Sequence, residues 1–278
     1  MILKSEMIQA FSNHLKDEEK SCNTVNKYLR DVEAFSAFVG NRPLTKECVI
    51  GYKDQLIQGG YAVRSINSML ASVNSLLQFL GMYECRVRTI RVQRQIYCPE
   101  AKELSKTEYL RLVNAAQSRG SARTGLILET ICGTGIRVSE LCYITVEAAK
   151  RGEAIVTCKG KIRTVFLVRE LQKKLLRYSA EQGIESGCIF VTKSGKPLDR
   201  TNIWRDMKTL CEKANVDPEK VYPHNLRHLF ARVFYGLEKD IAKLADILGH
   251  SSINTTRVYI ISTGVEHRRR MERMCLIT

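Results

Sequence analysis

Apolar residues recur at helical spacing along most of this chain, and this periodicity restricts it to a largely α-helical fold. The clearest stripe runs from Ile66 to Leu80, where apolar residues at positions 66, 69, 70, 73, 76, 77 and 80 share one face. Similar stripes begin near Ile8 and Val25, and a further helix is expected after Thr45, which can cap it. The first part of the chain is therefore predicted to be a small bundle of four amphipathic helices.

One β-hairpin interrupts the helical pattern later in the chain. The segments Glu153 to Cys158 and Arg163 to Val168 are β-rich and flank the turn Lys159-Gly160-Lys161-Ile162. Helices are expected on either side, at Leu126 to Cys132, Leu171 to Tyr178 and Ile203 to Ala214. The predicted fold class is mainly α with a small antiparallel β-sheet.

A helix-start signal divides the chain into two domains. Ser105-Lys106-Thr107-Glu108 is a capping box, in which the serine and glutamate side chains satisfy each other's backbone amides. The stretch before it shows no helical stripe, contains Pro99 and carries arginines at close intervals, as an extended basic linker would. We therefore predict an N-terminal helical domain at residues 1–85, a linker at 86–103 and a second domain at 104–278.

The charge of the chain indicates a polyanionic partner. Lys and Arg number 44 against 29 Asp and Glu, which gives a net charge of +15 and a pI near 9.4. Such an excess costs self-repulsion, and nucleic acid is the usual partner, although a merely soluble basic protein has a similar composition. The side chains predicted to contact DNA phosphates are Lys27, Arg30, Arg64, Arg88 and Arg91.

Cysteine spacing and hydropathy exclude several other classes of protein. The ten cysteines are scattered singly, without a CxxC pair, and no secretory signal precedes them, so a reduced cytoplasm is expected. Neither the cysteines nor the histidines show the spacing of metal ligands, so no metal and no other cofactor is predicted. No run approaches eighteen apolar residues, and a membrane-spanning helix is not expected.

The C-terminal part of the chain carries four residues that could converge on one anionic group. His224 and Arg227 are three positions apart on a predicted helix and therefore share a face. The next helix ends at Gly249, and His250 follows it directly. Tyr259 lies near the end of a third helix. Each residue alone is more often a capping or packing residue, so only the combination indicates a site.

Residues from earlier in the chain extend this candidate phosphate site. Gly133-Thr134-Gly135 allows a tight turn where backbone amides approach a ligand, and Arg137 follows it. Glu140, one helical turn further on, could hold the guanidinium in place. A lysine at the hairpin tip, Lys159 or Lys161, is the remaining candidate.

These separated segments together resemble the tyrosine recombinase/integrase family, also called the phage integrase family. The segments that carry the resemblance are GTGIRVSEL, CKGKIRTVFL, HNLRH and LGHSSINTTRVY. It implies a tyrosine-recombinase catalytic domain preceded by a four-helix, SAM-like core-binding domain, as in simple Xer-like members. Lys159 is preferred to Lys161 because it directly precedes Gly160, as in the family's pattern. Carried over by residue, the resemblance implies activating roles for Arg137, Lys159, His224, Arg227 and His250, a supporting role for Glu140, and Tyr259 as the nucleophile.

The implied chemistry is DNA strand exchange without metal or ATP. Two arginines can bind the nonbridging oxygens of a phosphodiester and stabilise its pentavalent transition state, while a lysine protonates the leaving 5′ oxygen. Attack by tyrosine leaves a 3′-phosphotyrosine, and exchange passes through a Holliday junction. Two alternatives remain open, a type IB topoisomerase-like enzyme that reseals the same strand and a DNA-binding accessory protein without cleavage.

The resemblance also implies an assembly. Double-stranded DNA with an inverted-repeat core site is the expected partner, bound by a homotetramer on two sites, and a monomer in free solution is compatible with this. The C-terminal tail is expected to contact the neighbouring subunit. An accessory protein or partner recombinase is not excluded.

Overall fold

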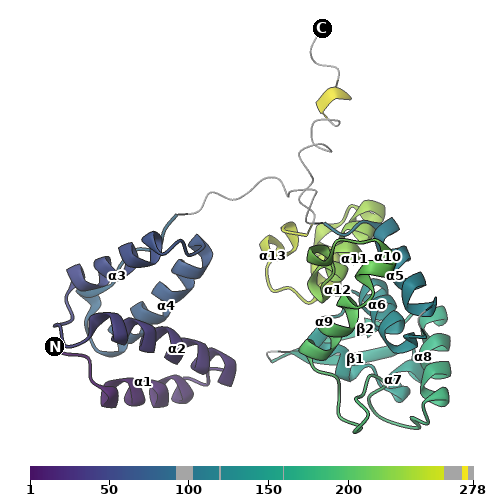
Figure 1. Ribbon diagram of the computed structural model, residues 1–278, viewed down its shortest axis with the longest axis horizontal. Coiled ribbons are helices and arrows are strands. Elements are labelled where there is room, and N and C mark those ends of the chain that lie inside the picture. The colour runs from purple at the N-terminus through teal and green to yellow at the C-terminus, as the bar shows by residue number, and fades with distance from the viewer. Residues whose placement is uncertain (92–102, 119, 159, 260–270, 275–278) are drawn as a thin grey trace. The chain divides into compact units, whose positions relative to one another are not determined.

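The chain divides into two compact units, Met1–Arg94 and Gln95–Thr278, each with its own hydrophobic core (Figure 1). The computed structural model describes residues 1–91, 103–118, 120–158, 160–259 and 271–274. Within these ranges no helix is both long and apolar enough to cross a membrane.

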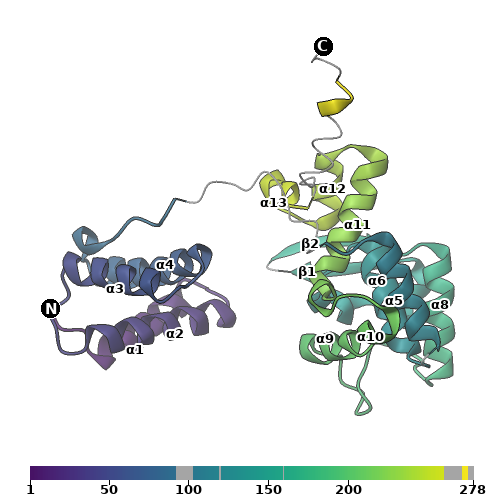
Figure 2. The ribbon, with the colours of Figure 1, turned by 45° about the horizontal axis from the view of Figure 1, so that its top comes forward.

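The first unit is the predicted bundle. Its elements are α1 (Ser5–Asp17), α2 (Cys22–Val39), α3 (Lys46–Gln58), α4 (Val63–Phe79) and the 3₁₀ turn η1 (Tyr83–Cys85). Figure 2 shows α3 and α4 lying over α1 and α2. Phe11, Phe35 and Leu70 are fully buried between the helices. Thr45 caps α3 as expected, since its side chain accepts a hydrogen bond from the Cys48 amide.

The predicted linker does not begin at residue 86, because the chain there is still attached to the first unit. The Asn74 amide side chain donates to the carbonyl of Val87 (2.9 Å) and accepts from its N–H (3.0 Å). Asn67 grips Ile90 in the same way, at 2.9 and 2.8 Å. Each asparagine therefore satisfies both backbone groups of an extended residue. The remainder of the predicted linker up to residue 102 lies outside the described residues.

The second unit contains the predicted hairpin among helices. Its first elements are α5 (Lys106–Ser118), α6 (Ala122–Thr134), the 3₁₀ helix η3 (Val138–Tyr143), α7 (Val146–Arg151), β1 (Glu153–Cys158), β2 (Lys161–Phe166) and α8 (Arg169–Glu181). They are followed by α9 (Arg200–Lys208), α10 (Cys211–Ala214), η4 (Pro218–Lys220), α11 (Pro223–Glu238), α12 (Ile241–Leu248) and α13 (Ile253–Arg257). Ser105 and Glu108 form the predicted capping box before α5. Helix α6 is central and contacts α5, α8, α9 and α11.

The hairpin has one face in the core and one face outside. In the antiparallel register Ala154 lies opposite Val165 and Val156 lies opposite Arg163, and this face points inward. The opposite face leaves Ile162 and other apolar residues exposed. Strand β2 begins at Lys161, earlier than the predicted Arg163, because Cys158 already pairs with Lys161.

The predicted helix from Ile203 to Ala214 is in fact two helices, α9 and α10. The Leu210 amide bonds the carbonyl of Met207 (3.2 Å) and the Thr209 hydroxyl bonds that of Asp206 (2.8 Å). The Leu210 bond reaches three residues back instead of four, and a turn at Thr209 and Leu210 separates the two helices.

Candidate active site

Arg227 is a buried arginine that joins three elements of the second unit. It lies on α11 and is 2% exposed. Its Nη1 donates to the carbonyl of Gly135 after α6, and its Nη2 donates to the carbonyl of Leu248 at the end of α12 (2.6 Å). Nη2 also lies 3.0 Å from Nε2 of His250. The guanidinium therefore fixes the ends of α6 and α12 against α11.

Arg227 keeps its charge despite this burial. Burial lowers its pKa to about 10, helped by the nearby charge of Arg137 and opposed by the side chain of Tyr259. The group is thus cationic at neutral pH. Its Nε is buried and has no acceptor among the described residues.

His250 is held as a neutral imidazole with a defined tautomer. Its Nδ1 lies 2.8 Å from the hydroxyl of Thr256. Because a guanidinium can only donate, Nε2 must accept from Arg227, and the proton resides on Nδ1. Burial, together with the charges of Arg227, Arg137 and Arg163, lowers the pKa of His250 to about 4.

Arg137 forms part of a charged cluster at the start of η3. Its Nη1 pairs with Oε1 of Glu140 (2.8 Å), and its own backbone amide donates to Oε2 (2.9 Å). Glu140 is 1% exposed and also pairs with Arg163 of β2 (2.6 Å). Burial alone would raise the pKa of Glu140, but the Arg137 hydrogen bonds and the two arginine charges lower it overall. The carboxylate is therefore ionised.

Tyr259 is covered by three imidazole rings. It follows α13 by two residues, is 6% exposed, and packs with Leu244 and Leu248 of α12. The ring centroids of His224 and His250 both lie 5.3 Å from that of Tyr259. The ring of His228 stacks on it at 5.0 Å.

The two histidines of α11 are both kept neutral. Burial is the largest cause that lowers the pKa of His224, and the neighbouring His228 and Arg227 add to it. Burial also lowers the pKa of His228, whereas the hydrogen bond from its Nε2 to the carbonyl of Val258 (3.1 Å) raises it by a smaller amount. Since that carbonyl can only accept, Nε2 of His228 carries the proton.

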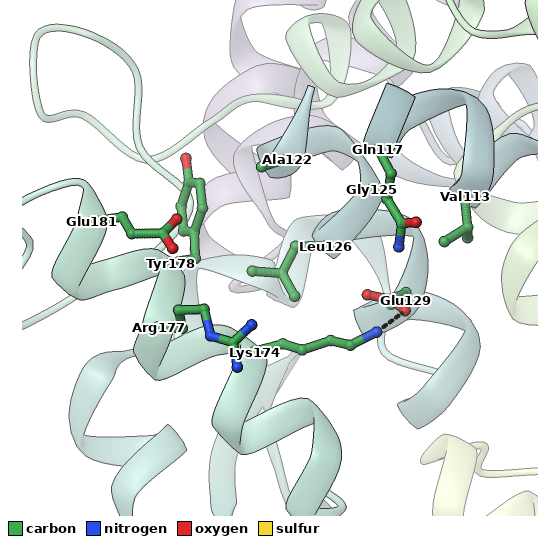
Figure 3. Close-up of a pocket in the computed structure, with 10 residues that line it drawn as sticks. All are labelled: Val113, Gln117, Ala122, Gly125, Leu126, Glu129, Lys174, Arg177, Tyr178 and Glu181. Carbon is green, nitrogen blue, oxygen red and sulfur yellow. Dashed lines mark hydrogen bonds and ion pairs between the residues drawn. The ribbon is translucent and has the colours of Figure 1, made fainter. Parts of the chain in front are cut away.

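A pocket of about 200 Å³ opens beside these groups, between the hairpin and the end of α12. Its charged and polar lining consists of Arg137, Arg163, His250 and the acidic Asp246, and Arg137 is the more exposed of the two arginines. Figure 3 shows a separate pocket between α5, α6 and α8, where Lys174 pairs with Glu129. None of the predicted site residues lines this second pocket.

The structure brings most of the predicted site residues together. Direct contacts link Arg137 to Glu140 and Arg227 to His250, and the turn after α12, at Gly249 (the α12 turn), joins the two pairs. The ring of Tyr259 lies against those of His224 and His250 and brings His224 to the same site. Lys159 lies outside the described residues, and the side chain of its rival Lys161 is not described either. In the described part of the chain, no three His, Cys, Asp or Glu residues gather as metal ligands would.

One of the predicted DNA contacts, Lys27, also binds residues of its own unit. Lys27 forms an ion pair with Asp31 (2.7 Å) and donates hydrogen bonds to the carbonyl of Ser68 (2.6 Å) and the hydroxyl of Ser72 (3.0 Å), all inside the first unit. These contacts stabilise the bundle, and the contact of Lys27 with DNA stays a prediction. The remaining predicted contacts, Arg30, Arg64, Arg88 and Arg91, are exposed.

Three residues of the site were not identified from the sequence. Arg163 lies on the inward face of β2, and a signal was available, because it alternates with the apolar Val165 in the predicted strand. His228 follows Arg227 by one residue and shares a helix face with His224, so helical spacing could have indicated it. Thr256, which fixes the His250 tautomer, gives no such signal.

Comparison with known proteins defines the class. The phage integrase family matches residues 102–264, and the phage integrase N-terminal SAM-like domain matches residues 8–82. These matches cover more than half of the chain, and the chain belongs to the phage integrase family. The family resemblance predicted from the sequence is confirmed, together with the mainly α fold and its small sheet.

Individual relatives resemble the chain along most of its length. Tyrosine recombinase XerA of Pyrococcus furiosus is 29% identical, with 99% of this chain and 96% of the relative covered. Tyrosine recombinase XerD of Halalkalibacterium halodurans is also 29% identical, with 94% of each covered. A lambda integrase tetramer bound to a Holliday junction has a similar fold, with a TM-score of 0.72, 18% identity, and 91% of this chain and 76% of that chain covered.

Proposed function

We propose that this chain is a tyrosine-type site-specific DNA recombinase, which cuts and rejoins DNA strands through a 3′-phosphotyrosine and a Holliday junction. The observation that carries the proposal is the convergence of Tyr259, two arginines and neutral imidazoles in one site. Membership of the phage integrase family and the Xer recombinases among its relatives support it. Its substrate is double-stranded DNA with an inverted-repeat core, in the cytoplasm.

The two arginines bind the scissile phosphate in this mechanism. Arg137 is about one-third exposed beside the pocket, so its outward N–H groups can reach nonbridging oxygens. Arg227 is buried, and its unpartnered Nε calls for an acceptor that a phosphate oxygen would supply. Together they stabilise the charge of the pentavalent transition state.

The imidazoles serve the nucleophile. A tyrosine hydroxyl must lose its proton as it attacks, because its unperturbed pKa is near 10. His224, whose lowered pKa leaves it unprotonated at neutral pH, is the proposed base. Nε2 of His250 accepts a hydrogen bond from Nη2 of Arg227 and so orients the guanidinium. For Nε2 to donate to a phosphate instead, the imidazole must bind a second proton, and the negative charge of the phosphate favours this. Lys159 is the proposed acid for the 5′ oxygen.

The assembly is a homotetramer on two DNA sites. The fold shared with a lambda integrase tetramer on a Holliday junction supports this arrangement. Strand exchange between two duplexes requires four active tyrosines, whereas relaxation of one duplex requires one. Assembly on DNA therefore separates recombination from the topoisomerase-like alternative.

A two-site plasmid tests the proposal. A binding site selected from random DNA is placed twice, in direct repeat, on a supercoiled plasmid that is incubated with the protein without metal or ATP. We expect deletion of the intervening DNA as a recombinant circle. Relaxed plasmid without recombinants would favour the topoisomerase-like enzyme, and binding without either product would favour an accessory protein.

A further inference from the structure

Arg163 is a largely covered arginine that lines the pocket and that the proposed mechanism does not use. Its side chain is 12% exposed, against 32% for Arg137. Its Nη2 pairs with Oε2 of Glu140 (2.6 Å), and its Nη1 donates to the carbonyl of Ile247 in α12 (2.8 Å). Because it belongs to β2, it ties the hairpin to both Glu140 and the α12 turn.

The α12 turn is shaped to accept this side chain. Gly249 has a φ of +64°, and a Cβ at this position would lie 2.5 Å from Cδ of Arg163. The carbonyl of Gly249 faces Nη2 of Arg137 (3.4 Å), and His250 follows it. A movement of Arg163 therefore reaches Arg137 by two routes, through Glu140 and through the turn.

The charges of the cluster give Arg163 a second effect. Glu140 pairs with both arginines, so the cluster of two guanidiniums and one carboxylate carries one positive charge. Without Arg163, the buried carboxylate would be balanced by Arg137 alone, and the cluster would be neutral. A neutral ion pair attracts a phosphodiester far less than a cation does.

We propose that Arg163 is a positioning residue for strand cleavage, which neutralises Glu140 so that the charge of Arg137 remains available to the scissile phosphate. The inference rests on the proposed function. Arg163 acts through Glu140 and Arg137 and does not touch DNA itself. Its low exposure and its hydrogen bonds to Glu140 and to the carbonyl of Ile247 distinguish it from a surface cation that binds phosphate directly.

The test measures covalent adduct formation on a nicked site, whose cut end diffuses away and traps the protein on the DNA. Arg163→Met should slow adduct formation by about 10- to 100-fold at saturating protein, as expected when a catalytic group is displaced or its charge is cancelled. Binding of the uncut site should change by less than about threefold, because many other cations share the phosphate contacts. Arg163→Lys keeps the charge but cannot donate to Glu140 and Ile247 at the same time, as the guanidinium does. Its rate of adduct formation should lie between those of Arg163→Met and the unchanged chain.

Arg123 provides a matched control in the same unit. It also joins a carboxylate, Asp206 (2.9 Å), to a backbone carbonyl, that of Val191 (3.1 Å), but it lies away from the site. Arg123→Met should lower the melting temperature and leave the cleavage rate within about twofold, because a surface-near ion pair contributes to stability alone.

A double variant separates charge from packing. Glu140→Gln removes the carboxylate, so adding it to Arg163→Met restores one positive charge on Arg137. We expect the double variant to cleave faster than Arg163→Met alone, a non-additivity that loss of packing cannot produce. The double variant also leaves no unpaired charge buried, so it is informative even where Arg163→Met folds poorly, and Arg163→Lys is a second comparison.

The outcomes are distinct. Loss of rate in Arg163→Met with recovery in the double variant supports the inference. A double variant slower than either single variant would overturn it, as would Arg163→Met cleaving as fast as Arg123→Met. If the unchanged chain forms no adduct, the proposed function itself fails.

Discussion

At the scale of single residues, Arg227 makes the most specific demand on its side chain. Its guanidinium serves two carbonyls and one imidazole, and no other side chain has donors in that arrangement. Arg227→Lys and Arg227→Ala should each reduce cleavage by at least roughly 10²–10³-fold, the usual cost of a positioned transition-state donor. Affinity for the uncut site should fall much less.

Single-turnover cleavage and a binding titration on the same DNA measure this difference. The control is Arg177→Ala, an exposed arginine of α8 at the pocket of Figure 3, which should leave both quantities unchanged. Equal losses of affinity and rate in the Arg227 variants would mean that this arginine only holds DNA.

Three histidines with lowered pKa values make stability depend on pH. His250 has a folded pKa of about 4 against an ordinary value of 6.5, so between these values the unfolded chain binds more protons than the folded chain. The free energy of unfolding must then decrease as pH falls through this window. The contribution of the neutral imidazole to stability is fully present above pH 6.5. His224 and His228, whose pKa values are also lowered, act in the same direction.

Urea denaturation at several pH values from 7 to 4.5 measures this dependence. His250→Gln should flatten the decline, because it removes the group whose pKa is lowered to about 4 in the folded chain. A decline that is identical in the His250 variant and the unchanged chain would show that this imidazole is not shielded.

The sequence identifies a site residue when local backbone geometry places its side chain, and misses it when tertiary packing does. Motif spacing was enough for His224, Arg227 and His250, because residues at helical spacing or beside a C-terminal glycine are placed by local geometry. Strand alternation with Val165 could have placed Arg163 on the inward face of β2, but its partners Glu140 and Ile247 are far away in sequence, and no local pattern links Thr256 of α13 to His250. The hydrogen bonds of Lys27 to Ser68 and Ser72 could not be predicted, because these residues lie on a different helix, α4.

At the scale of elements, the turn after α12 combines a helix end with a contact to the hairpin. Gly249 and Gly183 both have positive φ, +64° and +67°, but only Gly249 has a neighbour that an added Cβ would meet. Gly183→Ala should therefore cost only the left-handed backbone strain, about 1–2 kcal/mol. Gly249→Ala should cost more and should also slow cleavage, because Arg163 must move.

Unfolding and cleavage measured on this pair of variants isolate the contact. The difference between them is the effect of displacing Arg163, since the backbone cost is shared. Equal destabilisation with unchanged cleavage would show that the turn tolerates a side chain.

The elements themselves were largely predictable. The four helices of the first unit, the Ser105 capping box and the hairpin follow from periodicity and capping, which are local signals. The break between α9 and α10 was missed because apolar spacing continues across it, and the early start of β2 because register is fixed by pairing with β1. The asparagine clamps on Val87 and Ile90 join segments far apart in sequence, so the start of the linker could not be predicted either.

At the scale of the whole molecule, the chain end is proposed to join subunits. Met271 and Met274 are exposed, and they stand among apolar residues that extend to the C-terminus. Deleting residues 271–278 should leave binding to one site nearly intact and abolish assembly of two sites, because a head-to-tail contact closes the ring. Gel mobility shifts with one and two sites measure both effects. Synapsis and recombination at the unchanged rate would restrict the tail to other roles.

The central claim is that Tyr259 attacks DNA, and a nicked site tests it most directly. The unchanged chain should form a protein–DNA adduct that survives denaturant, Tyr259→Phe should bind the same DNA without forming it, and Tyr235→Phe, a neighbouring tyrosine in the same apolar cluster, should form it normally. An adduct that persists in Tyr259→Phe would contradict the account and move the nucleophile to another residue.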